Sequence, residues 1–239
     1  MITSITLCIT VFNEEENLDH LFVDIRKLID SMPSLSVVLV DNGSQDSSSK
    51  MLQNFASKNQ SNVTVAVLEK NLGYGGGLTH AARLAETEYV CFYSADCQYL
   101  AEDLILLIEK FCELKSSRSE LFVLKGSRIN RKDSWQANLV SKVYTILCNL
   151  FLGVNSKDVN GLPKIAPKVY LDSLAGSVST SFFFDAQILF MARKFQNEII
   201  ELNVSFSPRE RGSSSWAGKR VQTYFRTLHE MIAFRKEMK

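Results

Sequence analysis

The chain has 239 residues, with 27 Lys and Arg against 26 Asp and Glu, and 46% of its residues are hydrophobic. This length suits one domain with a sizeable core, and the average composition excludes a disordered, collagen-like or repeat protein. A net charge of +1 gives no electrostatic case for nucleic-acid binding. The five cysteines are scattered without a C-x-x-C pair, which indicates reduced intracellular thiols. With no apolar run long enough to span a membrane and no signal-peptide pattern, we expect a soluble cytoplasmic protein.

In the first half of the chain, short β-branched and aromatic runs alternate with segments of helical period. The apolar runs end in polar or glycine-rich turns, as strands buried on both faces do. The expected strands are 5–12, 35–41, 63–68 and 89–93. The expected helices are 18–29, 46–57, 78–86 and 102–114. Asn13 is the expected N-cap of the first helix. This order predicts a mostly parallel, Rossmann-like sheet with helices on both faces.

Beyond about residue 115 the alternation loosens, which predicts a mixed second half. The expected strands there are 121–124 and 198–206. The expected helices are 135–151, 185–194 and 217–234. We therefore predict an α/β fold with a Rossmann-like half followed by a mixed half.

Four of the expected strands lead into polar turns, where ligands bind in open parallel sheets. These turns are 10–14, 40–44, 71–77 and 94–98. Each alone is an ordinary capping turn as readily as a binding site, because Asp, Asn, Ser and Gly favour turns. Their convergence at one sheet edge favours a site. The glycine run from Gly73 is neither a dinucleotide fingerprint, which would need glycine at Leu78, nor a P-loop. It serves either a tight turn or close backbone approach to a ligand.

Seven segments, in order, resemble the family-2 glycosyltransferases of GT-A fold, and specifically the dolichyl- or polyprenyl-phosphate glycosyltransferases (dolichyl-phosphate mannose synthase-like). The segments are 12–18, 40–46, 71–77, 94–104, 126–128, 158–164 and 209–214. Each segment is weak alone, but together they extend the resemblance over residues 4–217. The resemblance implies a GT-A fold with a mixed, acceptor-side second half. It also implies a hexosyltransferase that moves a sugar from a nucleotide-sugar donor to a polyprenyl phosphate, with inversion at the anomeric carbon.

The resemblance also implies roles for individual residues. Those implied to bind the nucleotide sugar are Phe12, Glu14, Asp41, Gly73, Asp96, Lys164 and Arg209. Asp96 and Gln98 fall at the metal and diphosphate positions of a D-x-D motif, which implies Mg²⁺ or Mn²⁺. Arg128 falls among the cations that surround the donor or acceptor phosphates, and we expect Asp96 and Arg128 to act in catalysis. Asp185 is either a further catalytic carboxylate facing the acceptor or the N-cap of the helix that follows it.

Three positions depart from the family pattern. Thr10 stands where the family commonly has proline, Asn42 replaces the second acid of an Asp-Asp pair, and Ser94 replaces the first Asp of D-x-D. The last change removes a carboxylate, so we expect weaker metal binding. Three interpretations remain open: an enzyme with a weakened metal site, catalysis with little metal dependence, or a nucleotide-sugar-binding subunit without turnover.

Two stretches could contact a lipid. Residues 135–151 carry an apolar stripe flanked by aromatic residues, which is either a core helix or an interfacial helix. Residues 209–239 hold 8 basic and 3 acidic residues, so we separate a basic amphipathic helix, 216–239, from a glycosyltransferase domain, 1–215. Such a helix suits an anionic membrane surface or an integral-membrane partner as well as plain packing on the domain.

We therefore predict an inverting glycosyltransferase on the cytoplasmic face of a membrane, acting on a polyprenyl (dolichyl or undecaprenyl) phosphate. A phosphate acceptor is already an anion at pH 7 and needs little help from a general base. The alternatives are transfer to a sugar hydroxyl of a surface polysaccharide, for which Asp185 would be the base, and the non-catalytic binding subunit.

Overall fold

A computed structural model describes residues 5–132, 134–174, 176–209, 211–212 and 220–238. In this described part, seven strands form one sheet in the order β3-β2-β1-β4-β6-β5-β7. The strands are β1 (Ile5–Val11), β2 (Ser36–Asp41), β3 (Val63–Val67), β4 (Tyr89–Ser94), β5 (Phe122–Ile129), β6 (Lys164–Pro167) and β7 (Glu198–Ser205). All neighbouring pairs are parallel except those that β6 makes with β4 and β5. The expected α/β fold with a mostly parallel sheet is confirmed.

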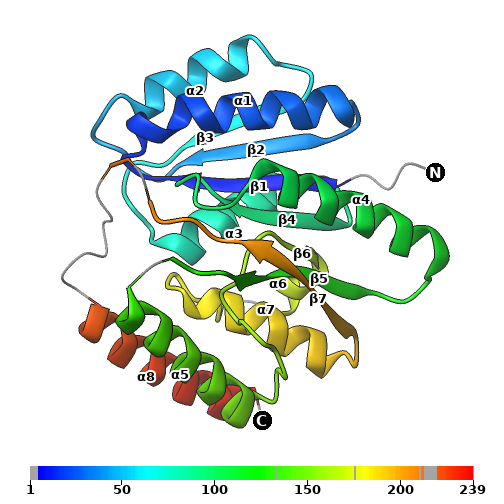
Figure 1. Cartoon of the computed structure of the whole chain (residues 1–239), viewed down its shortest axis with the longest axis vertical. Coiled ribbons are helices and arrows are strands. Elements are labelled where there is room, and N and C mark those ends of the chain that lie inside the picture. Colours follow the sequence, from blue (N-terminus) through cyan, green and yellow to red (C-terminus); the bar gives the residue numbers. More distant parts are fainter. Residues whose placement is uncertain (1–4, 133, 175, 210, 213–219, 239) are drawn as a thin grey trace.

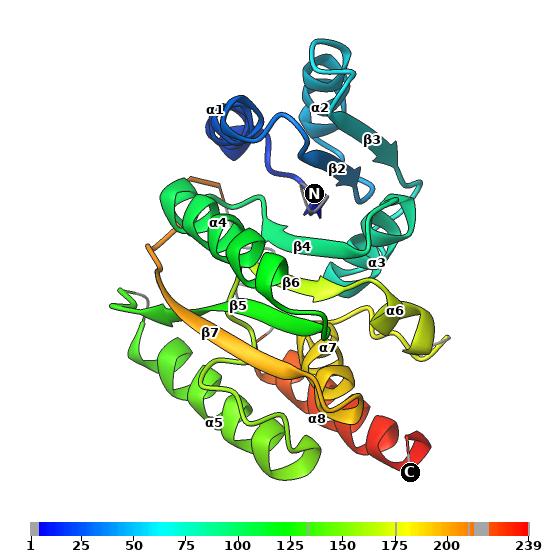
Figure 2. The same ribbon diagram turned by 90° about the vertical axis from the view of Figure 1, so that its right-hand side faces the viewer.

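Helices cover both faces of the sheet (Figures 1 and 2). The helices are α1 (Glu15–Ser31), α2 (Ser48–Ser57), α3 (Tyr74–Leu84), α4 (Ala101–Ser117), α5 (Trp135–Leu152), α6 (Val169–Leu174), α7 (Phe183–Lys194) and α8 (Arg220–Glu237). Helices α1, α2 and α4 lie on one face, and α3, α6 and α7 lie on the other. Alternation along β4 explains this arrangement, because Tyr89 packs against Phe111 of α4 whereas Phe92 packs against Phe184 of α7.

Two helix starts differ from the expectation. Helix α1 begins at Glu15 after the cap position Glu14, so the prediction that Asn13 caps it is wrong. Asn13 instead adopts a positive φ of 54°, and its side-chain oxygen accepts the Gln45 N–H at 2.8 Å. Helix α3 begins at Tyr74, inside the glycine run, which we expected to be a turn as far as residue 77. Both differences lie at the sheet edge where the polar turns gather.

The second half contains a strand and a helix that the sequence pattern did not predict, β6 and α6. β6 is four residues long and runs antiparallel between β4 and β5, so it enters the sheet from the carboxyl edge of those strands. Its first residue, Lys164, therefore lies close to that edge.

Helices α5 and α8 form an outer layer beneath α7 (Figure 1). The described part of α8 packs on the domain through Met231 and Phe234, which are buried. The Phe234 ring contacts Phe183 and Phe190 of α7, with centroids 5.4 and 5.1 Å away. Within the described part of the chain, no helix has both the length and the apolar character needed to cross a bilayer.

Candidate active site

The predicted polar turns do converge on one edge of the sheet. In the parallel ladders Val11 pairs with Asp41, and Thr10 pairs with Ser94, so β1, β2 and β4 end at the same level. β5 runs antiparallel to β6, which is antiparallel to β4, so β5 ends at the same edge and brings Arg128 with it. Parallel topology thus gathers residues that are more than 100 positions apart.

The ends of β1 and β2 carry Phe12, Glu14 and Asp41, which the sequence predicts to bind the nucleotide. Phe12 is half-buried directly after β1. The Asp41 side chain is buried, and its Oδ1 accepts the Ser44 N–H at 2.9 Å. The Glu14 N–H donates to the Ser48 hydroxyl at 2.9 Å. The turn after β2 is therefore held by its own Asp41 side chain, and the turn after β1 is held by a side chain at the start of α2.

Asn42, directly after β2, shows why an amide can replace the second acid of the Asp-Asp pair. Its Nδ2 donates to the Gly73 carbonyl at 3.0 Å and to the Asn71 side-chain oxygen at 3.2 Å. Its Oδ1 accepts the Leu72 N–H at 2.9 Å. A carboxylate cannot donate the first two bonds, so Asn42 ties β2 to the loop before α3 in a way that aspartate would not.

Close backbone approach explains the glycines at the start of α3. Gly73 has φ 80° and ψ 171°, and a Cβ there would lie 2.3 Å from the Thr180 carbonyl oxygen. A Cβ on Gly75 would lie 2.1 Å from the Ser179 oxygen, and the Gly75 N–H donates to Thr180 at 3.1 Å. The absence of side chains in this run therefore lets α3 pack closely on the segment that leads into α7. Gly73 itself forms the turn between the end of the Asn71 loop and α3.

Asp96 and Gln98 follow β4 at the centre of the edge. The Ser94 hydroxyl donates to Asp96 Oδ1 at 2.8 Å, and the Gln98 N–H lies 3.3 Å from the same oxygen. The Gln98 side-chain nitrogen donates to the Ser207 carbonyl at 2.9 Å, so its amide oxygen is left as an acceptor. Ser94 thus supports the one carboxylate of the motif by a hydrogen bond in place of a second negative charge.

The segment after β7 crosses this edge and delivers Arg209. Tyr99 forms an isolated bridge with Phe206, and the Ser207 N–H donates to the Gln98 carbonyl at 2.9 Å. Arg209 then forms an ion pair with Glu14, 195 residues away in the chain. Burial raises the pKa of the Glu14 carboxyl above its ordinary value, although Asn17 and Arg209 oppose this shift. The segment therefore connects the turn after β4, through Ser207, to the turn after β1, through Arg209.

Arg128 is held at the end of β5 by Asp158. Two hydrogen bonds of 2.7 Å join the guanidinium to the two carboxylate oxygens, and the guanidinium lies 5.2 Å from the centroid of the Phe206 ring. The hydrogen bonds and positive charge of Arg128 hold the pKa of Asp158 well below its usual range, against the effect of burial. This paired, stacked geometry fixes the position of the cation.

Lys164 and Asp185, which the sequence predicts to contact the donor and the acceptor, are both buried inside the protein. They form an ion pair with each other, and the residues are 0% and 1% exposed. Burial lowers the pKa of Lys164, and Asp185 opposes that shift. Asp185 lies in the first turn of α7, where Phe182 takes the cap position, so the alternative of Asp185 as an N-cap is wrong. Desolvation and the nearby Asp185 raise the pKa of Tyr74 well above its ordinary value.

A second buried lysine, Lys125, was missed by sequence reasoning. Its Nζ donates to the backbone oxygens of Gly126 and Asp158, both at 2.6 Å, and lies 3.3 Å from Glu201. Burial, followed by the nearby Lys164, lowers its pKa to about 8. The signal was a lysine inside the apolar run of β5, a position where a solvated lysine does not fit.

Comparison with known proteins supplies the family. The model described as Glycosyl transferase family 2 matches residues 6–158, well over half of the chain. The chain belongs to glycosyl transferase family 2. The matched residues include the ends of β1, β2, β4 and β5 described above, and the fold is the GT-A fold.

Two relatives of this family-2 protein are undecaprenyl-phosphate 4-deoxy-4-formamido-L-arabinose transferases. The protein from Proteus mirabilis is 27% identical over 221 residues, covering 90% of this chain and 64% of its own. The protein from Aeromonas hydrophila is 25% identical over 213 residues, covering 89% and 62%. The chain therefore spans less than two thirds of the length of these curated relatives.

Solved structures agree on the fold. A mannosyltransferase from Pyrobaculum calidifontis, in complex with GDP-Man and Mn²⁺, superposes with a TM-score of 0.66 at 17% identity and covers 96% of this chain and 64% of its own. Glucosyl-3-phosphoglycerate synthase from Mycobacterium tuberculosis, in complex with Mn²⁺, UDP and its product, gives 0.68 at 15% identity, with coverages of 96% and 80%. Divalent cations thus accompany nucleotides in these solved proteins of the same fold.

The residues of this family-2 chain fit a cation only in part. Among the residues that the structure describes, no three His, Cys, Asp or Glu side chains are grouped to hold a metal. Asp96 offers one carboxylate and Gln98 one amide oxygen, which are hard ligands of the kind that Mg²⁺ and Mn²⁺ accept. These two side chains would supply only part of the ligands that a divalent cation needs.

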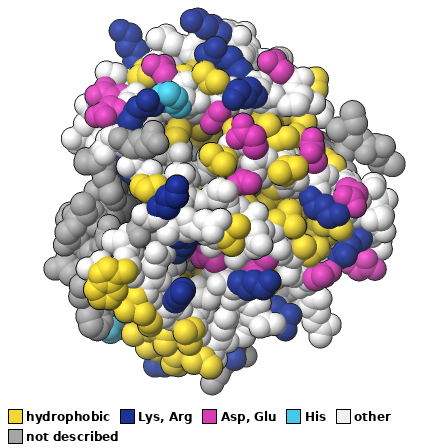
Figure 3. Space-filling model, in the orientation of Figure 1, with side chains coloured by type: hydrophobic (Ala, Val, Ile, Leu, Met, Phe, Trp, Pro, Cys, Tyr) yellow, Lys and Arg dark blue, Asp and Glu magenta, His cyan; other side chains and the backbone are white. Residues whose placement is uncertain are grey.

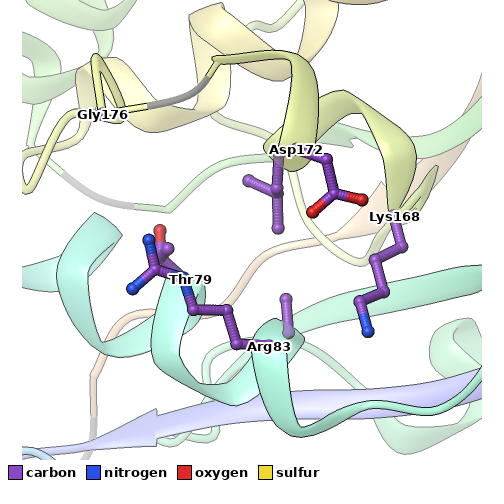
Figure 4. A pocket seen from close by; sticks show the side chains of 7 residues that line it. Thr79, Arg83, Lys168, Asp172 and Gly176 are labelled. Carbon is purple, nitrogen blue, oxygen red and sulfur yellow. The ribbon is translucent and has the colours of Figure 1, made fainter.

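A cavity elsewhere on the molecule lies between α3 and α6 and is lined by both charged and apolar groups (Figure 4). Its volume is about 170 Å³, and its lining includes Arg83, Lys168 and Asp172. The Lys168 N–H donates to the Glu88 carbonyl, directly before β4 begins, so this cavity lies toward the opposite sheet edge. It is separate from the strand ends and takes no part in the site.

Proposed function

We propose that this family-2 glycosyltransferase transfers a sugar from a nucleotide donor to a polyprenyl phosphate. The observation that favours a phosphate acceptor is that Asp185 is buried and ion-paired. A sugar hydroxyl needs a general base, and Asp185, the candidate for that role, is buried against Lys164. The histidines, His20, His80 and His229, lie on α1, α3 and α8 rather than at the strand ends. A phosphate needs no such base.

The donor occupies the ends of β1, β2 and β4 in this proposal. Phe12, Glu14 and Asp41 receive the nucleoside beside the Gly73 turn, and Arg209 faces the diphosphate from the segment that crosses the edge. Asp96 and Gln98 would hold a Mg²⁺ or Mn²⁺ ion, which neutralises the charge that develops on the leaving diphosphate.

The acceptor approaches from the β5 side. An oxygen of the acceptor phosphate attacks the anomeric carbon opposite the leaving group, so one C–O bond forms as the bond to the diphosphate breaks. No proton is transferred, and the configuration at carbon inverts. Arg128, oriented by Asp158, attracts the acceptor phosphate. Lys164 and Asp185 hold this side of the site in place as a positioning pair, because their charges face each other.

The first test is Asp96→Asn in a transfer assay with purified protein, Mn²⁺, a panel of UDP- and GDP-sugars and a polyprenyl phosphate. We expect kcat/KM to fall about 100-fold or more, since one centre of transition-state charge stabilisation is lost. Asp19→Asn, on the exposed side of α1, is the matched control and should keep full activity. Full activity of Asp96→Asn would refute the site, and undiminished transfer in excess chelator would refute the metal.

The serine at position 94 supports a second candidate, a nucleotide-sugar-binding subunit without turnover. Measuring both binding and transfer distinguishes the two candidates, because ligand binding raises the melting temperature whether or not transfer follows. A melting-temperature rise with a nucleotide sugar, combined with no transfer to any lipid or saccharide acceptor, would establish the second candidate. The proposed lipid acceptor places the active enzyme at the cytoplasmic face of a membrane, held there by its own surface or by an integral-membrane partner.

A further inference from the structure

Helix α5 has an exposed apolar face and, elsewhere on its surface, polar side chains that bond to the chain that follows it. The exposed apolar side chains are Trp135, Leu139, Val143, Ile146, Leu150 and Phe151. They form a hydrophobic patch at the lower left of the space-filling view, where α5 lies in Figure 1 (Figure 3). The core-helix alternative for this stripe is therefore wrong. The Asn149 side chain accepts the Ser156 N–H and donates to the Ser156 carbonyl, both at 2.9 Å, so α5 anchors the segment 156–158.

Glu201 of β7 holds the same segment through two of its residues. Its Oε1 accepts the Ser156 hydroxyl at 2.6 Å, and both carboxylate oxygens lie 3.1 Å from the Lys157 nitrogen that donates to them. Although burial opposes the shift, the charge of Lys125 and the Ser156 hydroxyl lower the pKa of Glu201 below its ordinary value. Glu201 is therefore ionised at neutral pH and can accept all of these bonds.

Lys125 of β5 joins Glu201 to the residue that ends this segment, Asp158. Its Nζ has three acceptors, which are the Gly126 and Asp158 carbonyls and Glu201 Oε1. An ammonium group has three N–H donors and a neutral amine has only two, so the charged form alone supplies all three bonds. Burial lowers the pKa of Lys125 to about 8, which leaves it charged at pH 7.

Asp158 is thus fixed by its backbone while its side chain fixes Arg128. The Asp158 carbonyl accepts from Lys125 at 2.6 Å. Its carboxylate accepts the Arg128 backbone N–H at 3.1 Å and two guanidinium N–H groups, each at 2.7 Å. Lys125 is 0% exposed, so it does not reach a substrate and can act only through the groups that it bonds.

We propose that Lys125 and Glu201 are positioning residues, which hold the segment 156–158 so that Asp158 places the Arg128 guanidinium for the acceptor phosphate. This role rests on the proposed function, because it takes the ligand of Arg128 to be that phosphate. A methionine at position 125 would fill a similar volume without the cost of burying a charge opposite Lys164. The ammonium therefore contributes more to the placement of Asp158 than to the stability of the fold.

Steady-state transfer kinetics with a short-chain, water-soluble polyprenyl phosphate test this role. Lys125→Met should raise KM for the acceptor about tenfold and leave KM for the nucleotide sugar unchanged, because only the acceptor meets Arg128. The matched control is Val123→Ala, also in β5 and also 0% exposed, which lowers stability by leaving a cavity but should keep both KM values. An unchanged acceptor KM in Lys125→Met, or an equal rise in both KM values, would overturn the proposal.

Two substitutions of Glu201 keep the test decisive if Lys125→Met fails to fold. Glutamine retains an oxygen that accepts from Ser156 and Lys125, whereas leucine retains none. Glu201→Leu should therefore raise the acceptor KM about tenfold, and Glu201→Gln should stay within about twofold of the wild type. Equal acceptor KM values for the two variants would overturn the proposal.

A double variant tests whether Lys125 acts through Asp158. Added to Asp158→Asn, Lys125→Met should change the acceptor KM little, because the carboxylate that orients Arg128 is already lost. A further rise of about tenfold on that background would show that Lys125 acts independently of Asp158, and would overturn the proposal.

NMR of the arginine Nε–H groups separates this proposal from the proposed function. The Arg128 signal, assigned by its loss in Arg128→Lys, reports the bond from Nε to Asp158 whether or not sugar is transferred. Lys125→Met should shift this signal and speed its exchange with water about tenfold, whereas Val123→Ala should leave it unchanged. An unchanged signal in Lys125→Met would overturn the positioning role. The expected shift in a protein that transfers no sugar to a polyprenyl phosphate would refute the proposed function and leave the positioning of Arg128 in place.

Discussion

The two halves of the sheet hold their polar residues by different physical means. In the parallel half, β1 to β4, the candidate site residues are fixed by hydrogen bonds within and between turns. The Ser44 N–H of its own turn fixes Asp41, and the loop before α3 fixes Asn42. In the half that contains β5 to β7, they are fixed by buried ion pairs, as Arg128 is by Asp158. The turn hydrogen bonds join these residues to neutral backbone groups, whereas a buried ion pair joins two opposite charges that satisfy each other.

The antiparallel strand explains this difference. β6 is inserted between β4 and β5, and in its register Lys125 lies directly opposite Lys164. Two buried ammonium groups repel each other, so each needs an acceptor or an anion of its own. Asp185 supplies one for Lys164, and Glu201 with the Asp158 carbonyl supplies one for Lys125. The β5 to β7 half of the candidate site is thereby held by its own ion pairs.

The largest effect should come from breaking the deepest of these pairs. Lys164→Met leaves the Asp185 carboxylate buried without its cation, so we expect the free energy of unfolding to fall by about 4 kcal/mol. Urea denaturation followed by circular dichroism measures it. Lys164→Met combined with Asp185→Leu should recover most of that loss, because neither charge then remains buried.

A surface lysine provides the control for this experiment. Lys110 pairs with Glu113 on the exposed side of α4, and Lys110→Met should change stability by less than about 0.5 kcal/mol. If Lys164→Met costs no more than Lys110→Met, then buried ion pairs are not what distinguishes the two halves.

The second largest effect should come from the contact between the start of α3, in the first half of the chain, and the segment before α7, in the second half. Gly73 has a backbone conformation that is essentially limited to glycine, and the Thr180 carbonyl fills the space that a Cβ would need. We expect Gly73→Ala to lower the free energy of unfolding by about 3 kcal/mol. It should also weaken nucleotide-sugar binding, measured by calorimetry, because α3 would move away from the segment before α7.

Gly153, at the end of α5, is the matched position. It also has a positive φ, 66°, but a Cβ there would meet nothing within 4 Å. Gly153→Ala should therefore cost about 1 kcal/mol, the conformational part alone. Equal losses for the two variants would mean that the contact with Thr180 contributes nothing to the joining of the halves.

The parallel half could be predicted from sequence because its signals are local. Apolar runs that end in turns locate the strands, and topology then brings Glu14, Asp41 and Asp96 to one edge. The start of α3 could not be located in this way, because glycine is a poor helix former and the Thr180 carbonyl that receives Gly75 is about 100 residues away.

The second half was harder because its signals are tertiary. β6 is only four residues long and follows Pro163, so periodicity does not reveal it. Lys125 and Glu201 become recognisable as a pair only when β5 and β7 lie side by side. The stripe on α5 was visible in the sequence, but periodicity does not tell which apolar face meets protein and which meets solvent.

The smallest effect concerns Asp158 and depends on pH. Arg128 keeps the folded-state pKa of Asp158 well below the ordinary value of 3.8, so the ionised carboxylate stabilises the fold above that value. At pH 7 the wild type should exceed Asp158→Asn by about 2 kcal/mol in unfolding free energy. As the pH falls below about 4, Asp158 becomes protonated in the unfolded chain but stays ionised in the folded protein. The difference in unfolding free energy between the wild type and Asp158→Asn should therefore shrink. A difference that stays constant from pH 7 to pH 3, measured by urea denaturation, would show that the pair positions Arg128 without stabilising the second half.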